Sequence, residues 1–262
     1  MHASVLRSAY DIVHGVRIHS LVSDGPRDRP TLVFVHGLGV STRYMKPTMS
    51  RLADHFDVAG LDFPGFGRSG TPPHILNVSE LSGVLRAWLD LRGIGPAIFV
   101  GNSFGCQIIV DCVLQSPERA LGLVLNAPTI DPAHRSMLSM IWRVIRDVPN
   151  EPASLALVVA RDYLRAGPYR ILTTLRHSLA DHIEEKLPSL ALPVLVVCGA
   201  HDPVVTVRWA SEVARLVGIE RTDAAGGAMQ CVGDAAHALP YDDPETFAEI
   251  IERFVGELVT TS

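Results

Sequence analysis

Ser103 has the surroundings expected of a reactive nucleophile. It is the centre of Gly101-Asn102-Ser103-Phe104-Gly105, between the strand-like residues 97–100 and the helix-like residues 106–115. A sharp turn from strand to helix strains the central residue, and glycines on both sides remove side chains that would clash. The hydroxyl then lies at the start of a helix, where free amides and the helix dipole favour negative charge. This pattern predicts attack by Ser103 on an acyl carbon.

The pentapeptide and its setting resemble the nucleophile elbow of the α/β-hydrolase fold superfamily, and the similarity covers nearly the whole chain. His36-Gly37-Leu38-Gly39, directly after residues 31–35, is similar to the oxyanion segment of that family. The resemblance implies that the backbone N–H groups of Leu38 and Phe104 form the oxyanion hole. Small residues suit this role because they let the loop approach a substrate closely. The resemblance also implies a serine hydrolase of the carboxylesterase type with a helical cap.

The acid of this family follows the serine and precedes the histidine, so an aspartate is expected after a later strand. Asp202 has this position, in Gly199-Ala200-His201-Asp202-Pro203 just beyond the apolar residues 194–198. The stretch is similar to the family's acid loop, and its proline would stiffen the loop. Asp131 and Asp223 remain alternatives, and some relatives use the position of Asp131.

His237 is the expected base, on a loop after the strand-like residues 228–232. Small residues surround it in Gly233-Asp234-Ala235-Ala236-His237-Ala238, which would let the loop fold inward. Serine is a poor nucleophile at neutral pH, and a histidine with a pKa near its ordinary value of about 6.5 can remove the serine proton. A buried carboxylate would fix the tautomer of the ring and stabilise the imidazolium. Ser103, Asp202 and His237 are therefore the predicted catalytic residues, and Ser103 would carry the acyl-enzyme.

A third stretch, Asp62-Phe63-Pro64-Gly65-Phe66-Gly67-Arg68-Ser69, is similar to a loop that is frequent in the superfamily. It indicates the fold rather than the chemistry. Asp62 and Arg68 are expected to stabilise this loop, because a segment rich in glycine and proline must satisfy its own backbone polar groups.

Apolar runs alternate with helix-length segments along the chain, as in a sheet whose strands are joined by crossover helices. A β-hairpin is expected over residues 12–22, and Asn77 with Glu80 can form a capping box before a helix at 81–91. Further strands are expected at residues 31–35, 56–61, 97–100, 122–125 and 193–198. The predicted fold is α/β, a mostly parallel doubly wound sheet of the α/β-hydrolase type, formed by residues 1–128 and 189–262.

Residues 129–188 break this rhythm, since helical patterns at 137–146, 153–164 and 169–179 follow one another without a strand. They are predicted to form an inserted helical cap over the carboxyl ends of the strands, where open α/β sheets bind ligands. The cap would supply an apolar substrate pocket, unless the same side chains pack it onto the core. The candidate pocket residues are Met137, Leu138, Ile141, Trp142, Leu157 and Tyr163.

Carboxylic esters are the expected substrates, and several alternatives stay open. The Gly-Asn-Ser-Phe-Gly sequence also resembles carbon–carbon bond hydrolases of ring-cleavage products, but Ala238 stands where those enzymes usually carry tryptophan. Lactone hydrolysis and cofactor-free perhydrolysis use the same groups, and a non-catalytic hydrolase-like protein that binds a small ligand is the alternative outside enzymes. A dehalogenase or epoxide hydrolase would need a carboxylate in place of Ser103.

The composition limits the possible partners. A formal net charge of −5 and a pI near 6.1 give no electrostatic reason to bind nucleic acid. No apolar run approaches the roughly eighteen residues that span a bilayer, and the N-terminus lacks an apolar signal segment. We expect a cytoplasmic protein acting on a small acyl substrate. The oligomeric state is left open.

The cysteines and histidines do not indicate a metal site. Cys106, Cys112, Cys198 and Cys231 have neither a C-x-x-C pair nor zinc spacing, so buried free thiols are expected, including Cys106 close to Ser103. His177, Asp181 and His182 lie near one another at helical spacing, but a metal would need more ligands in a defined geometry. No cofactor or metal is predicted.

Overall fold

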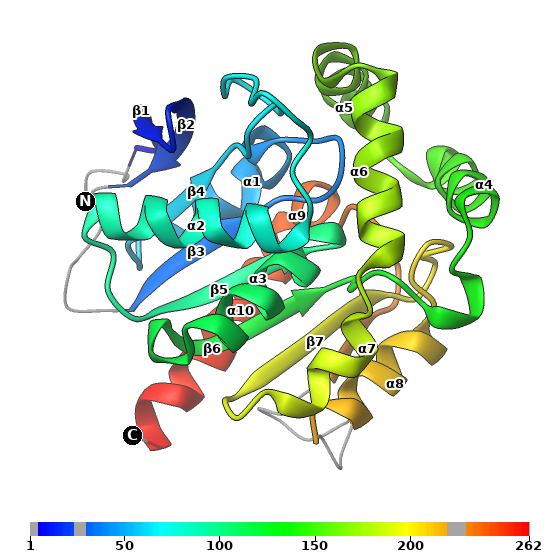
Figure 1. Cartoon of the computed structure of the whole chain (residues 1–262). Coiled ribbons are helices and arrows are strands. Elements are labelled where there is room, and N and C mark those ends of the chain that lie inside the picture. The colour runs from blue at the N-terminus through cyan, green and yellow to red at the C-terminus, as the bar shows by residue number, and fades with distance from the viewer. Residues whose placement is uncertain (1–4, 24–29, 219–228, 262) are drawn as a thin grey trace.

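The computed structural model describes residues 5–23, 30–218 and 229–261 of the chain. Asp223, one alternative to Asp202, lies outside these residues. An eight-stranded sheet runs through the molecule in the order β1-β2-β4-β3-β5-β6-β7-β8 (Figure 1). The edge strand β1 (Arg7–Val13) pairs antiparallel with β2 (Val16–Val22), and β2 pairs antiparallel with β4. The parallel strands are β3 (Thr31–Val35), β4 (Val58–Leu61), β5 (Ala97–Asn102), β6 (Ala120–Asn126), β7 (Val194–Gly199) and β8 (Met229–Val232).

The central strands are buried on both faces, which is why they appear in the sequence as continuous apolar runs. Val33 and Val35 of β3 belong to one apolar core, whereas Leu32 and Phe34 belong to the core on the opposite face. The first core is covered by α2 (Val78–Arg92), α3 (Phe104–Gln115) and α8 (Val207–Leu216), and the second by α1 (Thr42–Leu52), α9 (Leu239–Asp242) and α10 (Pro244–Thr261). Helices on both faces of a mostly parallel sheet confirm the predicted fold class.

Local signals set several of the element boundaries. Asn77 and Glu80 form the predicted capping box, with hydrogen bonds of 3.0 and 2.8 Å between each side chain and the other residue's backbone N–H. The helix α2 ends at Gly93, whose φ of 64° suits glycine. The strand β4 starts at Val58 rather than Phe56, because the Phe56 N–H donates to Leu52 O at 2.9 Å and closes the end of α1. The hairpin begins at Arg7, earlier than the predicted residue 12. The sequence did not mark residues 7–11 as a strand because they lack a regular alternation of apolar and polar side chains.

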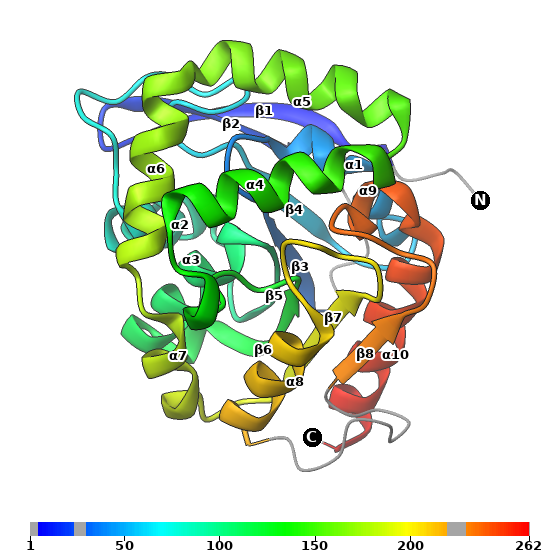
Figure 2. The ribbon, with the colours of Figure 1, turned by 90° about the vertical axis from the view of Figure 1, so that its right-hand side faces the viewer.

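Three longer helices connect β6 to β7 across the side where the parallel strands end. They are α4 (Met137–Asp147), α5 (Ala153–Ala166) and α6 (Pro168–Ala180), and the short α7 (Ile183–Lys186) leads back into the sheet. Figure 2 shows α4, α5 and α6 lying over the strand ends, with α4 nearest the viewer. Short 3₁₀ turns occur at Pro117–Arg119, Pro132–His134, Val148–Asn150 and Leu187–Ser189. Within the described ranges, no helix combines the length and apolar composition needed to cross a bilayer.

Asp62 holds the loop that follows β4, and it is only 1% exposed. Its Oδ1 accepts hydrogen bonds from the N–H and the hydroxyl of Thr42 at 2.8 and 2.7 Å. Its Oδ2 accepts from His19 Nδ1 and from the N–H of Arg68, each at 2.8 Å. Burial by itself raises the pKa of Asp62, but these hydrogen bonds and the nearby histidines hold it at about 2. Arg68 stabilises this loop through its backbone N–H, which donates to Asp62. Its side chain contacts Ser8 Oγ.

We expect Asp62→Asn to lower the free energy of unfolding by about 2 kcal/mol at pH 7, since each unit of pKa depression corresponds to about 1.4 kcal/mol. A depressed carboxyl pKa stabilises the native state above the unfolded pKa, and that stabilisation disappears as the pH falls through about 2. The deficit of the variant should therefore shrink between about pH 4 and pH 2. Urea unfolding at pH 7 and pH 3 measures it.

The matched control is Asp90→Asn, at an exposed carboxylate on α2 that pairs with Arg119. Exposed ion pairs contribute little, so this change should cost at most about 0.5 kcal/mol. An Asp62→Asn protein as stable as the control would contradict a central role for Asp62 in this loop.

Candidate active site

Ser103 joins β5 to α3 with φ 54° and ψ −119°. Residues other than glycine adopt this backbone conformation only under strain. A Cβ at Gly105 would lie 2.3 Å from Val35 O, so only glycine lets α3 begin this close to β3. A Cβ at Gly101 would lie 3.0 Å from the backbone nitrogen of Cys106. The Ser103 N–H donates to Asn126 O at 2.9 Å, which ties the turn to β6. A side chain at either glycine of the pentapeptide would therefore collide with neighbouring atoms.

Asp202 and His237 lie on the loops that follow β7 and β8, and they are in direct contact. His237 Nδ1 is 2.8 Å from Asp202 Oδ2, and the other Asp202 oxygen accepts from the N–H groups of Val204 and Val205 at 2.7 and 2.9 Å. The Asp202 side chain is fully buried. A carboxylate held by backbone donors can orient the imidazole and stabilise its protonated form.

The two loops approach each other through glycine and alanine. A Cβ at Gly199 would lie 2.3 Å from the carbonyl oxygen of Ala235, so a larger residue would push the loops apart. The His201 N–H donates to the same Ala235 oxygen at 3.0 Å. Ala235, Ala236 and Ala238 are all buried, in line with an inward fold of the His237 loop.

Asp131, the other acid considered, has different partners. Its Oδ2 accepts from Arg208 at 2.8 Å, and its Oδ1 accepts from the N–H of Ala133 at 2.9 Å. The carboxylate next to His237 Nδ1 is that of Asp202.

Ser103 and His237 both line a cavity of about 550 Å³ beneath α4, α5 and α6. No hydrogen bond joins these two side chains in the described part of the chain. Gly37, Leu38 and Phe104 line the same cavity. Phe104 is the first residue of α3, where helix geometry leaves the N–H without an intrahelical acceptor. The cavity therefore has a hydroxyl, an imidazole and a helix N-terminus on its wall.

The segment His36-Gly37-Leu38-Gly39 is shaped by close contacts on both sides. A Cβ at Gly37 would lie 3.4 Å from Ser103 Cβ, and at Gly39, with φ 81°, it would lie 2.1 Å from the Tyr163 ring of α5. His36 Nδ1 is 2.8 Å from Gly37 O, and its Nε2 is 3.1 Å from the N–H of Phe63, which donates to it. Burial lowers the pKa of His36, so the neutral ring links this segment to the loop after β4.

Two carboxyl groups that the sequence analysis did not consider, Asp147 and Glu151, also line the cavity. Glu151 Oε1 accepts from the N–H of Ala238, the residue after His237, at 2.9 Å. Burial and the negative charge of Asp147 raise the pKa of Glu151 to about 8. Burial likewise raises the pKa of Asp147. Both carboxyls therefore bind a proton more readily than an isolated carboxyl group does.

These acids also act on His237. Burial lowers its pKa, but the charge and hydrogen bond of Asp202, together with the charges of Asp147 and Glu151, raise the pKa to about 9. No motif in the sequence marks Asp147 or Glu151, because only the fold of the 129–188 segment brings them to the His237 loop.

The cavity wall differs from the predicted pocket. Ile141 and Tyr163 line the cavity, whereas Met137, Leu138, Trp142 and Leu157 do not. Leu138, Trp142 and Leu157 point outward, with exposed fractions of 81%, 61% and 77%. The helices α4 and α5 carry apolar residues on more than one side, so packing decides which of these residues face inward. The residues of segment 129–188 that line the cavity are Thr129, Met140, Ile141, Val144, Ile145, Asp147, Val148, Glu151, Pro152, Leu155, Ala156, Val159, Ala160, Tyr163, Ile171, Leu172, Leu175 and Ser178.

The cysteines are free thiols, and three of them are buried as expected. Cys106 Sγ donates to Gly101 O at 3.3 Å, and burial raises its pKa, so it is an unreactive thiol beside the elbow. Cys231 is exposed, contrary to the prediction. It lies on β8, the last strand of the sheet, which has a neighbouring strand on one side only.

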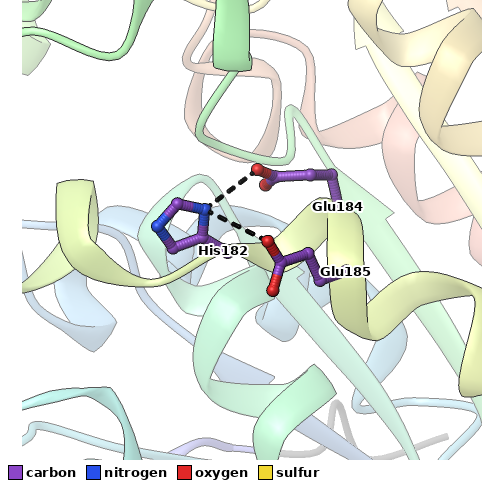
Figure 3. Close-up of side chains that lie close together, drawn as sticks. All are labelled: His182, Glu184 and Glu185. Carbon is purple, nitrogen blue, oxygen red and sulfur yellow. Dashed lines mark hydrogen bonds and ion pairs between the residues drawn. The ribbon is translucent and has the colours of Figure 1, made fainter.

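His177, Asp181 and His182, which lie at helical spacing in the sequence, have separate partners in the structure. His177 Nδ1 contacts Leu76 O at 3.1 Å, and Asp181 accepts from Gln107 and Lys186. His182 instead faces Glu184 and Glu185 at the start of α7, with N···O distances of 3.2 and 3.7 Å (Figure 3). Their ligand atoms lie within 4.8 Å of one another at the surface. Exposed ion pairs of this kind are common without a metal, so the cluster carries no assignment.

Comparison with known proteins adds the family. The profile of the alpha/beta hydrolase family matches residues 32–250. The chain is 24% identical over 269 residues to the uncharacterized hydrolase YugF of Bacillus subtilis, with 93% of this chain and 96% of that protein covered.

Solved structures show the same fold. The enol-lactonase from Burkholderia xenovorans LB400 superposes with a TM-score of 0.78 at 21% identity, over 95% of this chain and 100% of that one. A thermophilic esterase from Thermogutta terrifontis gives 0.76 at 19% identity, over 96% and 99%. The family match includes strands β3 to β8 and the loops that carry Ser103, Asp202 and His237. The chain belongs to the alpha/beta hydrolase family and is an enzyme of that type.

Proposed function

We propose that this protein is a serine hydrolase that cleaves a carboxylic ester or a related acyl substrate. Ser103 is the nucleophile, His237 the general base and acid, and Asp202 the carboxylate that orients His237. The observation that supports this best is the 2.8 Å contact between His237 Nδ1 and the buried Asp202, on the wall of the cavity that Ser103 also lines. With Nδ1 engaged, the Nε2 atom is left to take the serine proton.

The reaction follows from these positions. His237 removes the hydroxyl proton as Ser103 Oγ bonds to the acyl carbon, and the negative oxygen is stabilised by the N–H groups of Leu38 and Phe104. His237 then returns the proton to the leaving alcohol, and an acyl-enzyme remains. Water, activated by the same ring, releases the acid. Catalytic hydrogen bonds are often long before substrate binds, which fits the absence of a direct Ser103–His237 bond among the described residues.

Residues 129–188 act as a cap in this proposal. Their side chains form most of the apolar cavity wall, which suits an uncharged acyl group, and a cavity of about 550 Å³ has room for a small-molecule substrate. A lactone is the second candidate, because the chain shares its fold with the enol-lactonase as well as with the esterase. A lactone is an internal ester and needs the same nucleophile, base and oxyanion donors.

Ser103→Ala should abolish hydrolysis of p-nitrophenyl esters and of lactones while leaving the fold intact, because no other hydroxyl stands at the turn. Steady-state rates and labelling by a fluorophosphonate probe measure the loss. Ser211→Ala, which removes an exposed hydroxyl on α8 that donates to Val207 O, is the matched control. Full activity in the Ser103 variant would refute the assignment.

Asp202→Asn should lower kcat by about 10⁴, because the amide favours the wrong tautomer of His237. Asp131→Asn is the informative comparison, since Asp131 binds Arg208 and not His237. It should change kcat by less than about tenfold. The reverse order of the two losses would transfer the acid role to Asp131.

The pH dependence should report the raised pKa of His237. The base must be neutral to act, so kcat/KM should rise with pH, with its midpoint near pH 9, and level off about one pH unit higher. Glu151→Gln keeps an acceptor for the Ala238 N–H but removes a negative charge near the ring, so the midpoint should move to lower pH. Glu245→Gln, at a surface residue on α10, is the control. An unchanged midpoint in Glu151→Gln would show that this carboxyl does not act on His237.

A further inference from the structure

The outer side of helices α4, α5 and α6 carries positive charge, although the chain as a whole is acidic. Residues 137–180 contain the arginines 143, 146, 161, 165, 170 and 176 but only the acids 147, 151 and 162. Asp147 and Asp162 are 7% and 1% exposed, and Glu151 is half-buried on the cavity wall. Arg146, Arg161, Arg165 and Arg176 are exposed. The acids of this segment thus face inward, and its surface charge is arginine.

The same helices expose large apolar side chains. Leu138, Leu157 and Leu164 are 81%, 77% and 84% exposed, although burial of leucine is normally favoured. The exposed set on these helices and the α4–α5 turn is Leu138, Trp142, Val144, Ile145, Val148, Leu157, Leu164, Tyr169 and Leu172. Exposed apolar residues gathered in this way on one part of a surface indicate an interaction site.

Arginine and apolar residues alternate on the same helical stripes. On α5, Leu157, Arg161 and Leu164 follow one another at spacings of four and three, so they share one side of the helix. On α4, Trp142 and Arg146 are four apart. Figure 2 shows the three helices together on the side of the molecule beyond the strand ends. We call the exposed residues of α4, α5 and α6 and of the α4–α5 turn, apolar and arginine, the cap surface.

The cap surface is continuous with the cavity. Val144, Ile145, Val148 and Leu172 are 42%, 54%, 63% and 42% exposed, and all four also line the cavity that contains Ser103. An apolar molecule held against the cap surface would therefore meet an apolar wall on its way to the serine.

We propose that the cap surface binds the interface of a lipid bilayer that contains anionic lipids. Leucine, tryptophan and tyrosine side chains would enter the boundary between headgroups and acyl chains, while the arginines would pair with the phosphates above them. The charge distinguishes this partner from a second copy of the chain, since joining two cap surfaces would bring arginines together without exposed acids to pair with them. A nucleic acid backbone is bound through charge, so it would leave the exposed leucines and tryptophan without apolar contacts.

Co-sedimentation with sucrose-loaded vesicles tests the proposal on the full chain. The protein should bind vesicles of phosphatidylcholine containing about one third phosphatidylglycerol, bind phosphatidylcholine alone weakly, and dissociate as ionic strength rises. Arg146→Gln with Arg161→Gln should weaken binding to the anionic vesicles about twenty-five-fold, since each charge contributes about fivefold. Leu164→Ser with Tyr169→Ser should weaken binding by more than about tenfold through loss of apolar insertion.

Matched controls lie on other parts of the surface. Arg253→Gln on α10 and Leu91→Ser on α2 change an exposed arginine and an exposed leucine away from α4, α5 and α6, and should leave binding unchanged. Circular dichroism and thermal unfolding check that each variant is folded.

Three results of the vesicle experiments would overturn the proposal. They are absence of binding to anionic vesicles at low ionic strength, equal binding to phosphatidylcholine alone, and equal losses in the cap-surface and control variants. A dimer seen by light scattering that Leu164→Ser with Tyr169→Ser converts to a monomer would assign the cap surface to a second copy instead. Hydrolysis of a water-soluble ester by the unmodified protein is measured in parallel, so that failure of the proposed catalytic activity is recognised separately from failure of membrane binding.

Discussion

The close approach of backbone to backbone at the carboxyl ends of the parallel strands is the constraint on which the site depends. Gly105 begins α3 against the carbonyl of Val35, and Gly199 brings the loop after β7 against the carbonyl of Ala235. In both places a Cβ would lie 2.3 Å from an oxygen atom. A larger residue at Gly105 would push α3 away from β3, and one at Gly199 would push the Asp202 and His237 loops apart. The constraint is steric, and it acts before any catalytic group is considered.

The electrostatics of the cavity couple the helices over the strand ends to the sheet beneath them. Asp202 lies on the loop after β7, whereas Asp147 and Glu151 lie on the segment between β6 and β7. All three carboxylates raise the pKa of His237. Glu151 also accepts from the backbone next to His237. A segment that would otherwise only cover the cavity therefore influences the protonation of the imidazole. The inward acids and the outward arginines of this segment give its two sides opposite character.

The mostly parallel sheet and the alternation of its strands with helices along the chain could be predicted, because buried parallel strands are short apolar runs bounded by turn residues and crossover helices separate them. The elbow around Ser103 and the loops of Asp202 and His237 could be singled out because their glycines and alanines are local in sequence. Which stripe of an amphipathic helix faces the core is not local. Leu138 and Ile141 are both apolar and three residues apart, yet one is exposed and the other lines the cavity. Cys231 shows the same limit, since its exposure follows from the place of β8 at the sheet edge.

The sequence by itself determined the fold class, the order of its elements and the residue types at each strand end, because periodicity and turn chemistry act over a few neighbouring residues. Only the tertiary structure decided that Asp202 rather than Asp131 contacts His237, that two further carboxyls reach the cavity, and that arginine and leucine share the outer side of α4, α5 and α6. These outcomes depend on distances between segments far apart in the chain. Such distances are set by packing of the whole core, which no local pattern contains.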